Sequence, residues 1–449
     1  MDPQVLYKAV YKIVKLHLNI ELLNNTVTKK DINIIKSDVE TDTSSCSSKD
    51  SSDSSSSTST KRSVSAKVSS LQEKLDGLLT RYFQVPSAFF KLVRYHQVFT
   101  PIKIKNYLLI LPIGSGIYSQ TWYAVQLNIN KYVPVCIKIT TEKTHYESVC
   151  REYRLLKTIK HPCFPAPLEM FLFQGQCITI YDICGMTLYD YITQYQQTFT
   201  LRQIQFLITQ LASVYKCLKN NNILHGDIKP ENILLKDFYS PMIRYMDYKL
   251  KKAFPQGVQE KDDSLIKNLF IDVTLNDVQF CPLKEDQVKI VLCDFNLSNY
   301  QTCIDDKCVY TCYYQPPESF FRSGLFSGYS DMWSIGCTLY MLIMQEDLFD
   351  LDMYTEYKDA VQAISQCFYE NFPCDLLKKA KNTQLVKVYE DLKNQYWMYV
   401  SHWGDANGFR DMIEQKIVNR FTPDEAQGAK EIASVILNLI KVDPRLRTF

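Results

Sequence analysis

The chain has 449 residues and a mass of 52.3 kDa, and 46% of its residues are hydrophobic while 22% are charged. This globular composition excludes a wholly disordered, collagen-like or coiled-coil protein. The 51 basic and 49 acidic residues leave a net charge of +2, which excludes a global field for gathering nucleic acid or anionic lipid.

The sequence shows no secretion leader and no apolar run near the roughly 20 residues that a membrane helix needs. Its 15 cysteines are an odd number scattered through the chain, which is typical of reduced thiols rather than a disulfide framework. We therefore expect an intracellular protein, cytoplasmic or nuclear, with no membrane segment and no direct nucleic-acid contact.

Three segments are predicted ahead of the main domain. Residues 1–40 predict a helical extension, because apolar residues recur there at helical spacing. Residues 41–68 predict a Ser-rich disordered linker, because Ser and Thr fill 15 of the 20 places from 41 to 60. Residues 69–100 predict a helical lead-in, because a capping-box pattern precedes an apolar stripe.

From about residue 101 the pattern changes to short runs typical of β-strands. These runs are Tyr107 to Leu111, Thr121 to Gln126, Val133 to Ile139 and Cys177 to Ile183. A mostly helical half follows them. This segregation predicts an α+β fold with a β-rich lobe over about 101–184 and a larger helical lobe over about 185–449, and not an alternating parallel sheet.

A glycine-rich segment, Ile113 to Thr121, lies between two predicted strands. Glycines let a backbone approach phosphate groups, and successive N–H groups can cradle them. Taken alone, a hairpin turn is the commoner explanation of two close glycines. The run from Thr121 to Gln126 continues as a strand instead of a helix, which disfavours a dinucleotide-binding fold.

Lys138 lies inside an apolar strand. One interpretation is a solubility charge on an edge strand. The other is a buried lysine, which needs an acidic partner to stay charged. The predicted helix Glu147 to Ile159 offers Glu152 as that partner, and the glycine segment upstream then fits an ATP-phosphate clamp.

The segment from His225 to Leu235 brings Asp227, Lys229 and Asn232 onto a tight loop between apolar residues. A structural loop rarely needs all three, but phosphoryl transfer uses a carboxylate, a lysine and a metal-binding amide in this way. Asp294 follows a later apolar strand, where a carboxylate can hold magnesium.

In this order the motifs resemble those of eukaryotic Ser/Thr protein kinases, from about residue 100 to residue 449. The resemblance implies a bilobal protein kinase fold that uses ATP and Mg²⁺, with a hinge near Asp182 to Cys184. The implied ATP-binding residues are Ile113, Gly114, Ser115, Gly116, Ser119, Thr121, Lys138, Glu152, Asp182 and Cys184.

The resemblance also implies the chemical roles. Lys138 would contact the α- and β-phosphates and pair with Glu152. The implied catalytic residues are Asp227, as the base, and Lys229, and the implied magnesium ligands are Asn232 and Asp294.

Further positions match the structural supports of this family. The resemblance implies that Glu318 pairs with Arg447 and that Asp331 supports the catalytic loop from a buried helix. The sequence Asp227-Ile228-Lys229 is typical of Ser/Thr kinases rather than tyrosine kinases. Thr311 lies at the position where Ser/Thr kinases have a threonine that faces the substrate.

Within this family the chain is most similar to the CMGC kinases that act in splicing, namely the SR-protein kinases, the LAMMER kinases and the related pre-mRNA processing kinase. Ser119 with Trp122, and an insert of about fifty residues over 236–289, resemble the SR-protein kinases. The segments around Asp294 and from Asp331 to Tyr340 resemble the pre-mRNA processing kinase more closely.

Three departures affect this interpretation. Asn296 replaces a glycine after Phe295, and we expect its tolerance of left-handed geometry to preserve the turn. Gly226 replaces the arginine that binds an activation-loop phosphate in many kinases, so we predict activity without phosphorylation of that segment. Gln315 replaces an arginine and leaves substrate selection near it open. A pseudokinase scaffold is therefore the alternative function.

Acidic residues gather after the Asp331 helix, namely Glu346, Asp347, Asp350, Asp352, Glu356 and Asp359. One interpretation is a solvated face, and the other is docking of an Arg-rich substrate, since guanidinium groups pair bidentately with carboxylates. We expect a monomer that acts on protein substrates, Arg/Ser-rich if the splicing resemblance holds and unrelated to splicing otherwise.

Overall fold

The computed structural model describes residues 102–115, 119–140, 146–259, 262, 282–300, 312–322, 328–349, 364, 372–396 and 408–449. Residues Thr100–Phe449 form one compact unit. The three segments predicted within residues 1–100 lie outside the described residues, as do Gly116, Thr311 and the acidic residues from Asp350 to Asp359.

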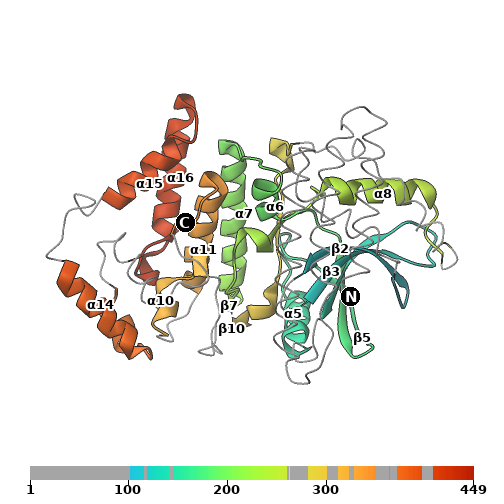
Figure 1. The fold of residues 1–449 in the computed structure, drawn as a ribbon, viewed down its shortest axis with the longest axis horizontal. Coiled ribbons are helices and arrows are strands. Elements are labelled where there is room, and N and C mark those ends of the chain that lie inside the picture. Colours follow the sequence, from blue (N-terminus) through green and yellow to red (C-terminus); the bar gives the residue numbers. More distant parts are fainter. Residues whose placement is uncertain are drawn as a thin grey trace, which may run out of the picture. The chain divides into compact units, whose positions relative to one another are not determined.

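The first lobe is built on a six-stranded antiparallel sheet in the order β1-β2-β3-β4-β6-β5 (Figure 1). Its strands are β1 (Ile102–Ile104), β2 (Tyr107–Ser115), β3 (Ser119–Gln126), β4 (Pro134–Thr140), β5 (Pro167–Phe173) and β6 (Gln176–Asp182). The four strands expected from the sequence are confirmed, while β1 and β5 are additional. The sheet curls until β1 and β5 approach, where Lys105 lies 3.5 Å from the centre of the Phe171 ring.

Helix α5 (Tyr146–Thr158) packs against this sheet. Its buried residues Val149, Leu155 and Leu156 recur at helical spacing. Glu152 is buried on the same helix although it carries a charge. A buried carboxylate needs a positively charged or hydrogen-bonding partner to stay ionised.

The second lobe is mainly helical, so the predicted α+β segregation into two lobes is confirmed. Its described helices are α6 (Leu188–Thr193), α7 (Leu201–Asn220), α8 (Pro241–Ala253), α10 (Pro317–Phe320), α11 (Gly328–Met344), α13 (Cys374–Lys378), α14 (Thr383–Tyr396), α15 (Gly408–Val418) and α16 (Ala426–Leu439). Short strands β7 (Ile223–Leu224) and β10 (Asn299–Tyr300) pair with each other, as do β8 (Ile233–Leu235) and β9 (Ile290–Leu292).

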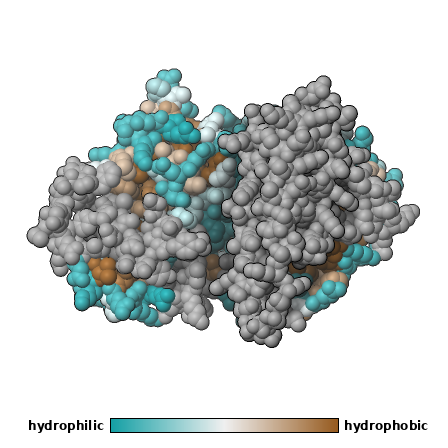
Figure 2. All heavy atoms as spheres, viewed as in Figure 1, coloured by the Kyte–Doolittle hydropathy of each residue, from teal (hydrophilic) through white to brown (hydrophobic). Residues whose placement is uncertain are grey.

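Helix α11 forms the centre of this lobe and is buried on all sides between α7 and α16. Its glycine, Gly336, allows α16 to approach, because a Cβ at this position would lie 2.6 Å from a side-chain carbon of Ile440. The face shown in Figure 2 exposes mainly hydrophilic residues over the described helices, with smaller hydrophobic areas between them. Among the described residues, no helix combines the length and apolarity needed to cross a membrane.

Candidate active site

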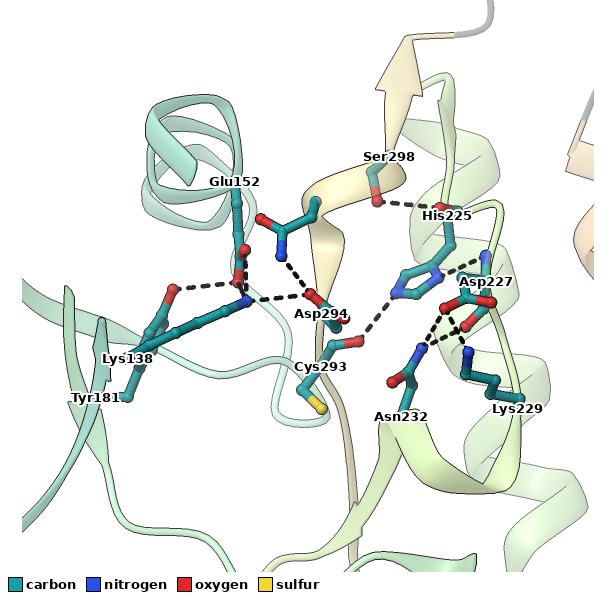
Figure 3. A network of polar contacts seen from close by, with 11 residues as sticks. Lys138, Glu152, Tyr181, His225, Asp227, Lys229, Asn232, Cys293, Asp294 and Ser298 are labelled. Carbon is teal, nitrogen blue, oxygen red and sulfur yellow. Dashed lines mark hydrogen bonds and ion pairs between the residues drawn. The ribbon is translucent and has the colours of Figure 1, made fainter. Parts of the chain in front are cut away.

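A charged triad joins the two lobes (Figure 3). Lys138 of β4 places its Nζ 2.8 Å from Oε2 of Glu152 and 3.0 Å from Oδ1 of Asp294, the carboxylate that follows β9. Burial lowers the pKa of Lys138, but the two carboxylates outweigh it and hold that pKa above its usual value. Burial likewise raises the pKa of Asp294, yet Lys138 brings it below its usual value. The predicted Lys138–Glu152 pair is confirmed, and its lysine is charged.

Tyr181 completes the surroundings of Glu152. Its hydroxyl donates to Oε1 of Glu152 at 3.2 Å, and its ring is buried at the end of β6. Burial raises the pKa of Tyr181 well above its usual value, so the hydroxyl keeps its proton and acts as a donor. Glu152 is thus held from both sides, by Lys138 of β4 and by Tyr181 of β6.

The catalytic-loop residues expected from the sequence converge on one carboxylate. Strand β7 leads into the loop, and a 3-10 turn at Pro230–Asn232 returns it to β8. Oδ2 of Asp227 lies 2.9 Å from Nζ of Lys229 and accepts from Nδ2 of Asn232 at 2.8 Å. The amide of Asn232 also donates to the backbone carbonyl of Asp227 at 2.8 Å. Lys229 and Asn232 therefore fix the orientation of Asp227.

Asp331 of α11 holds the loop from beneath, as expected. Its carboxylate accepts the backbone N–H groups of His225 and Gly226 at 2.8 and 3.0 Å. Burial raises the pKa of Asp331 to about 7, against the lowering effect of these two donors. Since Asp331 belongs to the central helix, the loop is anchored to the core of the second lobe.

His225 connects the loop to the segment around Asp294. Its Nδ1 accepts the backbone N–H of Asp227 at 3.2 Å, so Nε2 carries the proton and donates to the carbonyl of Cys293 at 3.1 Å. Burial lowers the pKa of His225, which keeps the ring neutral. Its ring also packs edge-on against Phe295, with centroids 4.6 Å apart.

The backbone after β9 corrects one sequence expectation. The left-handed residue is Asp294, with φ at 64°, whereas Asn296 lies inside a 3-10 turn, Phe295–Leu297. The prediction that Asn296 supplies the left-handed geometry is therefore wrong. Asn296 instead donates from Nδ2 to Oδ1 of Asp294 at 2.6 Å. Asp tolerates the left-handed region because its short polar side chain can bond locally.

The glycine-rich segment spans the end of β2 and the start of β3. Thr121 pairs with Lys138 across the sheet and therefore shares its face, and Gly114 pairs with Thr121 from the other side. Ile113 lies at a register shift of the β2–β3 pair. Ser119 is buried opposite Thr140. Only the backbone of Ser115 is described, and Gly116 is outside the described residues.

The predicted hinge follows β6. Asp182 is the exposed last residue of that strand, and Cys184 is half-buried two residues later. Gly185 donates its backbone N–H to the carbonyl of Lys236 at 3.2 Å. The chain leaves the first lobe at these residues, and their contact with ATP stays a prediction.

The remaining support residues also meet as expected. The guanidinium of Arg447 donates from Nη1 and Nη2 to the two carboxylate oxygens of Glu318, each at 2.8 Å, and both side chains are 0% exposed. Ser330 donates to Glu318 as well. This buried bidentate pair ties the start of α10 to the residues after α16.

Sequence reasoning missed Tyr181, Glu231 and Asp247. Glu231 lies in the 3-10 turn beside the catalytic loop, and one of its carboxylate oxygens is buried without a hydrogen-bond partner among the described residues. Its place between Lys229 and Asn232 was the available signal. For Tyr181 and Asp247 the sequence gives no signal, because their partners lie 29 to 124 residues away.

Comparison with known proteins places this geometry in context. A family model described as "Protein kinase domain" matches residues 107–448. Similar curated proteins include a probable serine/threonine-protein kinase, clkA, of Dictyostelium discoideum, 24% identical over 57% of this chain and 27% of its own. The dual specificity protein kinase KNS1 of Saccharomyces cerevisiae is 24% identical over 60% of this chain and 34% of its own.

The serine/threonine-protein kinase AFC1 of Arabidopsis thaliana is 26% identical over 54% of this chain and 48% of its own. The chain thus spans between about a quarter and a half of the length of these relatives. Among solved structures, the yeast RNA Pol II CTD kinase CTDK-1 complex matches with a TM-score of 0.50 and 16% identity, over 78% of this chain and 91% of that chain. At this identity the match concerns the fold alone.

Proposed function

Because this chain belongs to the protein kinase domain family and has its bilobal fold, we propose that it transfers the γ-phosphate of ATP to serine or threonine hydroxyls of proteins. The observation that carries the proposal is a pair of charged clusters. Lys138 of the first lobe meets Glu152 and, across the lobes, Asp294, while Asp227 of the second lobe meets Lys229 and Asn232.

The chain's own residues supply positioning and charge. Asp227 orients the acceptor hydroxyl and accepts its proton, while the adjacent Lys229 balances negative charge on the phosphoryl group. Lys138 is held charged by two carboxylates and meets the phosphates of the nucleotide. His225 connects the loop of Asp227 to the segment of Asp294 through two hydrogen bonds, so little reorganisation is needed during the reaction.

The donor set at Asp294 fits a magnesium ion. A carboxylate oxygen of Asp294 and the amide oxygen of Asn232 are ligands that Mg²⁺ prefers. Asn232 donates twice from Nδ2, and among the described residues its Oδ1 is left to bind a metal. When bound with ATP, Mg²⁺ supplies charge neutralisation at the phosphates.

Basic substrates are favoured by Glu231. Burial raises the pKa of Glu231 against the lowering effects of a backbone hydrogen bond and of Lys229, and the negative charges of Asp227 and Asp347 raise it further. A cationic side chain of a substrate would compensate the lost hydration of this carboxylate and offer a donor to the oxygen that has no partner among the described residues. We therefore propose Arg/Ser-rich protein substrates, with Glu231 and not the wider acidic cluster as the main contact. Glu346 of that cluster is already paired with Lys416 at 2.8 Å.

A charge-neutral variant tests this substrate preference. Glu231→Gln should raise the KM for an Arg/Ser-repeat peptide about tenfold, since a hydrogen bond to a charged group contributes about 1.5–3 kcal/mol, and change the KM for a neutral Ser peptide little. Glu346→Gln is the matched control, because its partner is within the protein. Equal effects of Glu231→Gln on both peptides would contradict the preference.

We also propose activity without phosphorylation of the activation segment. The support is Gly226, which stands where many kinases carry a phosphate-binding arginine and which has φ at +79°, a conformation unfavourable for arginine. Phosphatase-treated protein should transfer phosphate at the untreated rate. A loss of activity after that treatment, restored by rephosphorylation, would overturn this point.

The deciding experiment measures transfer of labelled phosphate from Mg-ATP to the Arg/Ser-repeat peptide and to the neutral peptide. Asp227→Asn is the blank, and removal of a positioned general base should lower the rate by about 10²–10⁴-fold. Signal that disappears in the blank supports the kinase. If wild-type protein binds ATP but transfers nothing above the blank to either peptide, a pseudokinase scaffold is the better function.

A further inference from the structure

The insert between the catalytic loop and Asp294 runs from one lobe to the other in its described part. It leaves β8 beside the hinge, where the carbonyls of Lys236 and Phe238 accept from Gly185 and Met186 at 3.2 and 3.0 Å. Gly185 permits this approach, since a Cβ there would lie 2.2 Å from the carbonyl oxygen of Leu235. The insert is therefore in direct backbone contact with the hinge.

Helix α8 then continues toward the small lobe. Ser240 caps it by accepting the backbone N–H of Ile243 at 3.3 Å. One side of the helix is buried, with Met246 and Leu250 fully enclosed, while Tyr248 on the other side is 59% exposed. In Figure 1, α8 lies beside the strands of the small lobe, away from α11 and α16. The insert thus packs against the sheet that carries Lys138.

Asp247 of α8 joins two tyrosines of the β3–β4 hairpin. The hydroxyls of Tyr123 and Tyr132 each lie 3.1 Å from Oδ1 of Asp247 and within hydrogen-bond distance of each other, so that one hydroxyl can donate to the other, which in turn donates to Asp247. Burial raises the pKa of both tyrosines above the usual value, so both hydroxyls remain protonated. Tyr123 is 0% exposed. A carboxylate from the insert therefore satisfies two polar groups inside the small lobe.

The end of the described insert attaches to the same hairpin. Asn128 donates its backbone N–H to the carbonyl of Val258 at 2.9 Å, and Leu127 and Val258 form a parallel bridge. Gly257 has φ at +91°, and a Cβ on it would lie 2.1 Å from the carbonyl oxygen of Ile129. The hairpin turn is thus held by backbone contacts that only glycine permits at this point.

The register of β3 and β4 connects these contacts to the active site. Tyr123 pairs with Cys136, and Thr121 pairs with Lys138, one step further along the same face. A shift of the hairpin at Tyr123 would therefore move the strand that positions the ammonium group of Lys138.

We propose that residues 236–259 form an interlobe brace, and that Asp247 is a positioning residue for phosphoryl transfer. This rests on the proposed kinase function. The brace is attached to the hinge at one end and to the β3–β4 hairpin at the other. It fixes Lys138 relative to the carboxylates of the second lobe, so that the nucleotide site is already aligned before substrates bind.

The test combines kinetics with hydrogen exchange on the full chain. Asp247→Ala should lower kcat by about ten- to a hundredfold, since a misplacement near 1 Å can cost about a hundredfold, with the KM for the peptide unchanged. Backbone amides of residues 119–140 should exchange faster, while those of 223–235 should not. Asp247→Asn retains a side-chain oxygen that can accept from the tyrosine pair, so this variant should keep most of the wild-type rate.

Tyr248→Phe is the matched control, since it removes an exposed hydroxyl from the same helix. The exchange measurement does not depend on kinase activity. If the wild-type protein proved inactive but Asp247→Ala still exchanged its amides faster, the proposed function would be contradicted and the brace proposal would stand. If Asp247→Ala had the same kcat and the same amide exchange rates as the wild-type protein, the brace proposal would be overturned. It would equally be overturned if Asp247→Ala and Asp247→Asn lowered the unfolding midpoint alike with no change in kcat.

Discussion

Tyr181 illustrates how one hydroxyl can support a charge without touching the substrate. It donates to Glu152, which in turn holds Lys138. Tyr181→Phe keeps the buried ring and removes only this bond to a charged acceptor. Such bonds contribute about 1.5–3 kcal/mol. If the loss at the lower end appears in full in the activation free energy, kcat/KM should fall about tenfold.

The matched control for this prediction is Tyr107→Phe. The Tyr107 hydroxyl donates to Glu169 at 3.1 Å across the curled sheet, away from Lys138, so its loss should leave kcat/KM within about twofold. Steady-state kinetics with varied ATP measures both variants. Equal losses in the two variants would mean that Tyr181 acts only on the stability of the sheet.

Asp331 predicts a pH dependence of stability. Its pKa is raised by burial to about 7, above the value of about 3.9 in an unfolded chain. The folded protein therefore holds this proton more tightly, and the contribution to stability is present below about pH 4 and is lost as the pH rises through 7. Denaturant unfolding of wild type and Asp331→Asn, from pH 5 to 8, isolates this group. The unfolding free energy of wild type relative to that of the variant should fall as the pH rises to about 7 and then stay constant. If this difference did not change with pH, the raised pKa of Asp331 would be contradicted.

At the scale of elements, Gly226 joins strand β7 to the catalytic loop in a conformation that few residues adopt. Its φ is +79°, and a Cβ added to it would meet only the Leu297 carbonyl oxygen at an ordinary 3.7 Å. The cost of Gly226→Ala is thus conformational, about 1–2 kcal/mol of unfolding free energy. Gly226→Asn should cost less, because Asn tolerates left-handed geometry. Denaturant melts should rank the stabilities Gly, then Asn, then Ala, and equal stability of all three would contradict this.

Much of the element order was predictable because strong local patterns encode it. Strands β3, β4 and β6 alternate or are continuously apolar, and helix α5 has a buried stripe. Strand β5 was missed because it begins with proline and buries only one of its residues. Helix α8 was not predicted because it lies inside an insert with no family pattern to mark it.

Candidate site residues were predictable for a different reason. Lys138, Asp227 and Asn232 were found because their spacing follows the chemistry of phosphoryl transfer. In the structure Lys138 meets its expected partner Glu152, and Asn232 meets Asp227. The left-handed backbone was assigned to Asn296 from residue preference alone. The structure has it at Asp294, whose Oδ1 accepts from Asn296, and the spacing of the residues does not reveal that contact.

At the scale of the whole molecule, the buried pair of Glu318 and Arg447 connects segments 129 residues apart in the chain. Removing one partner leaves an uncompensated buried charge, so Arg447→Met should cost about 3–5 kcal/mol of unfolding free energy. The double variant Glu318→Leu with Arg447→Met should recover part of this, because no charge is then left alone. Denaturant unfolding of both single variants and the double variant measures the coupling.

Arg445→Met is the control for that cycle. Arg445 pairs with Asp375 and Asp443 at the surface, where its side chain is 58% exposed. Solvent and salt screen such pairs, so its loss should matter far less than the loss of Arg447. Similar destabilisation by the two arginine variants would show that burial does not govern the Glu318 pair.

The attachment of Asp247 to Tyr123 and Tyr132 also has a consequence for synthesis of the protein. Asp247 follows Tyr132 by 115 residues, so at about 5–20 residues per second it leaves the ribosome roughly 6 to 23 seconds later. During that interval the hairpin exists without the carboxylate that its hydroxyls require. The small lobe, although made first, therefore reaches its final arrangement only after part of the second lobe has been translated.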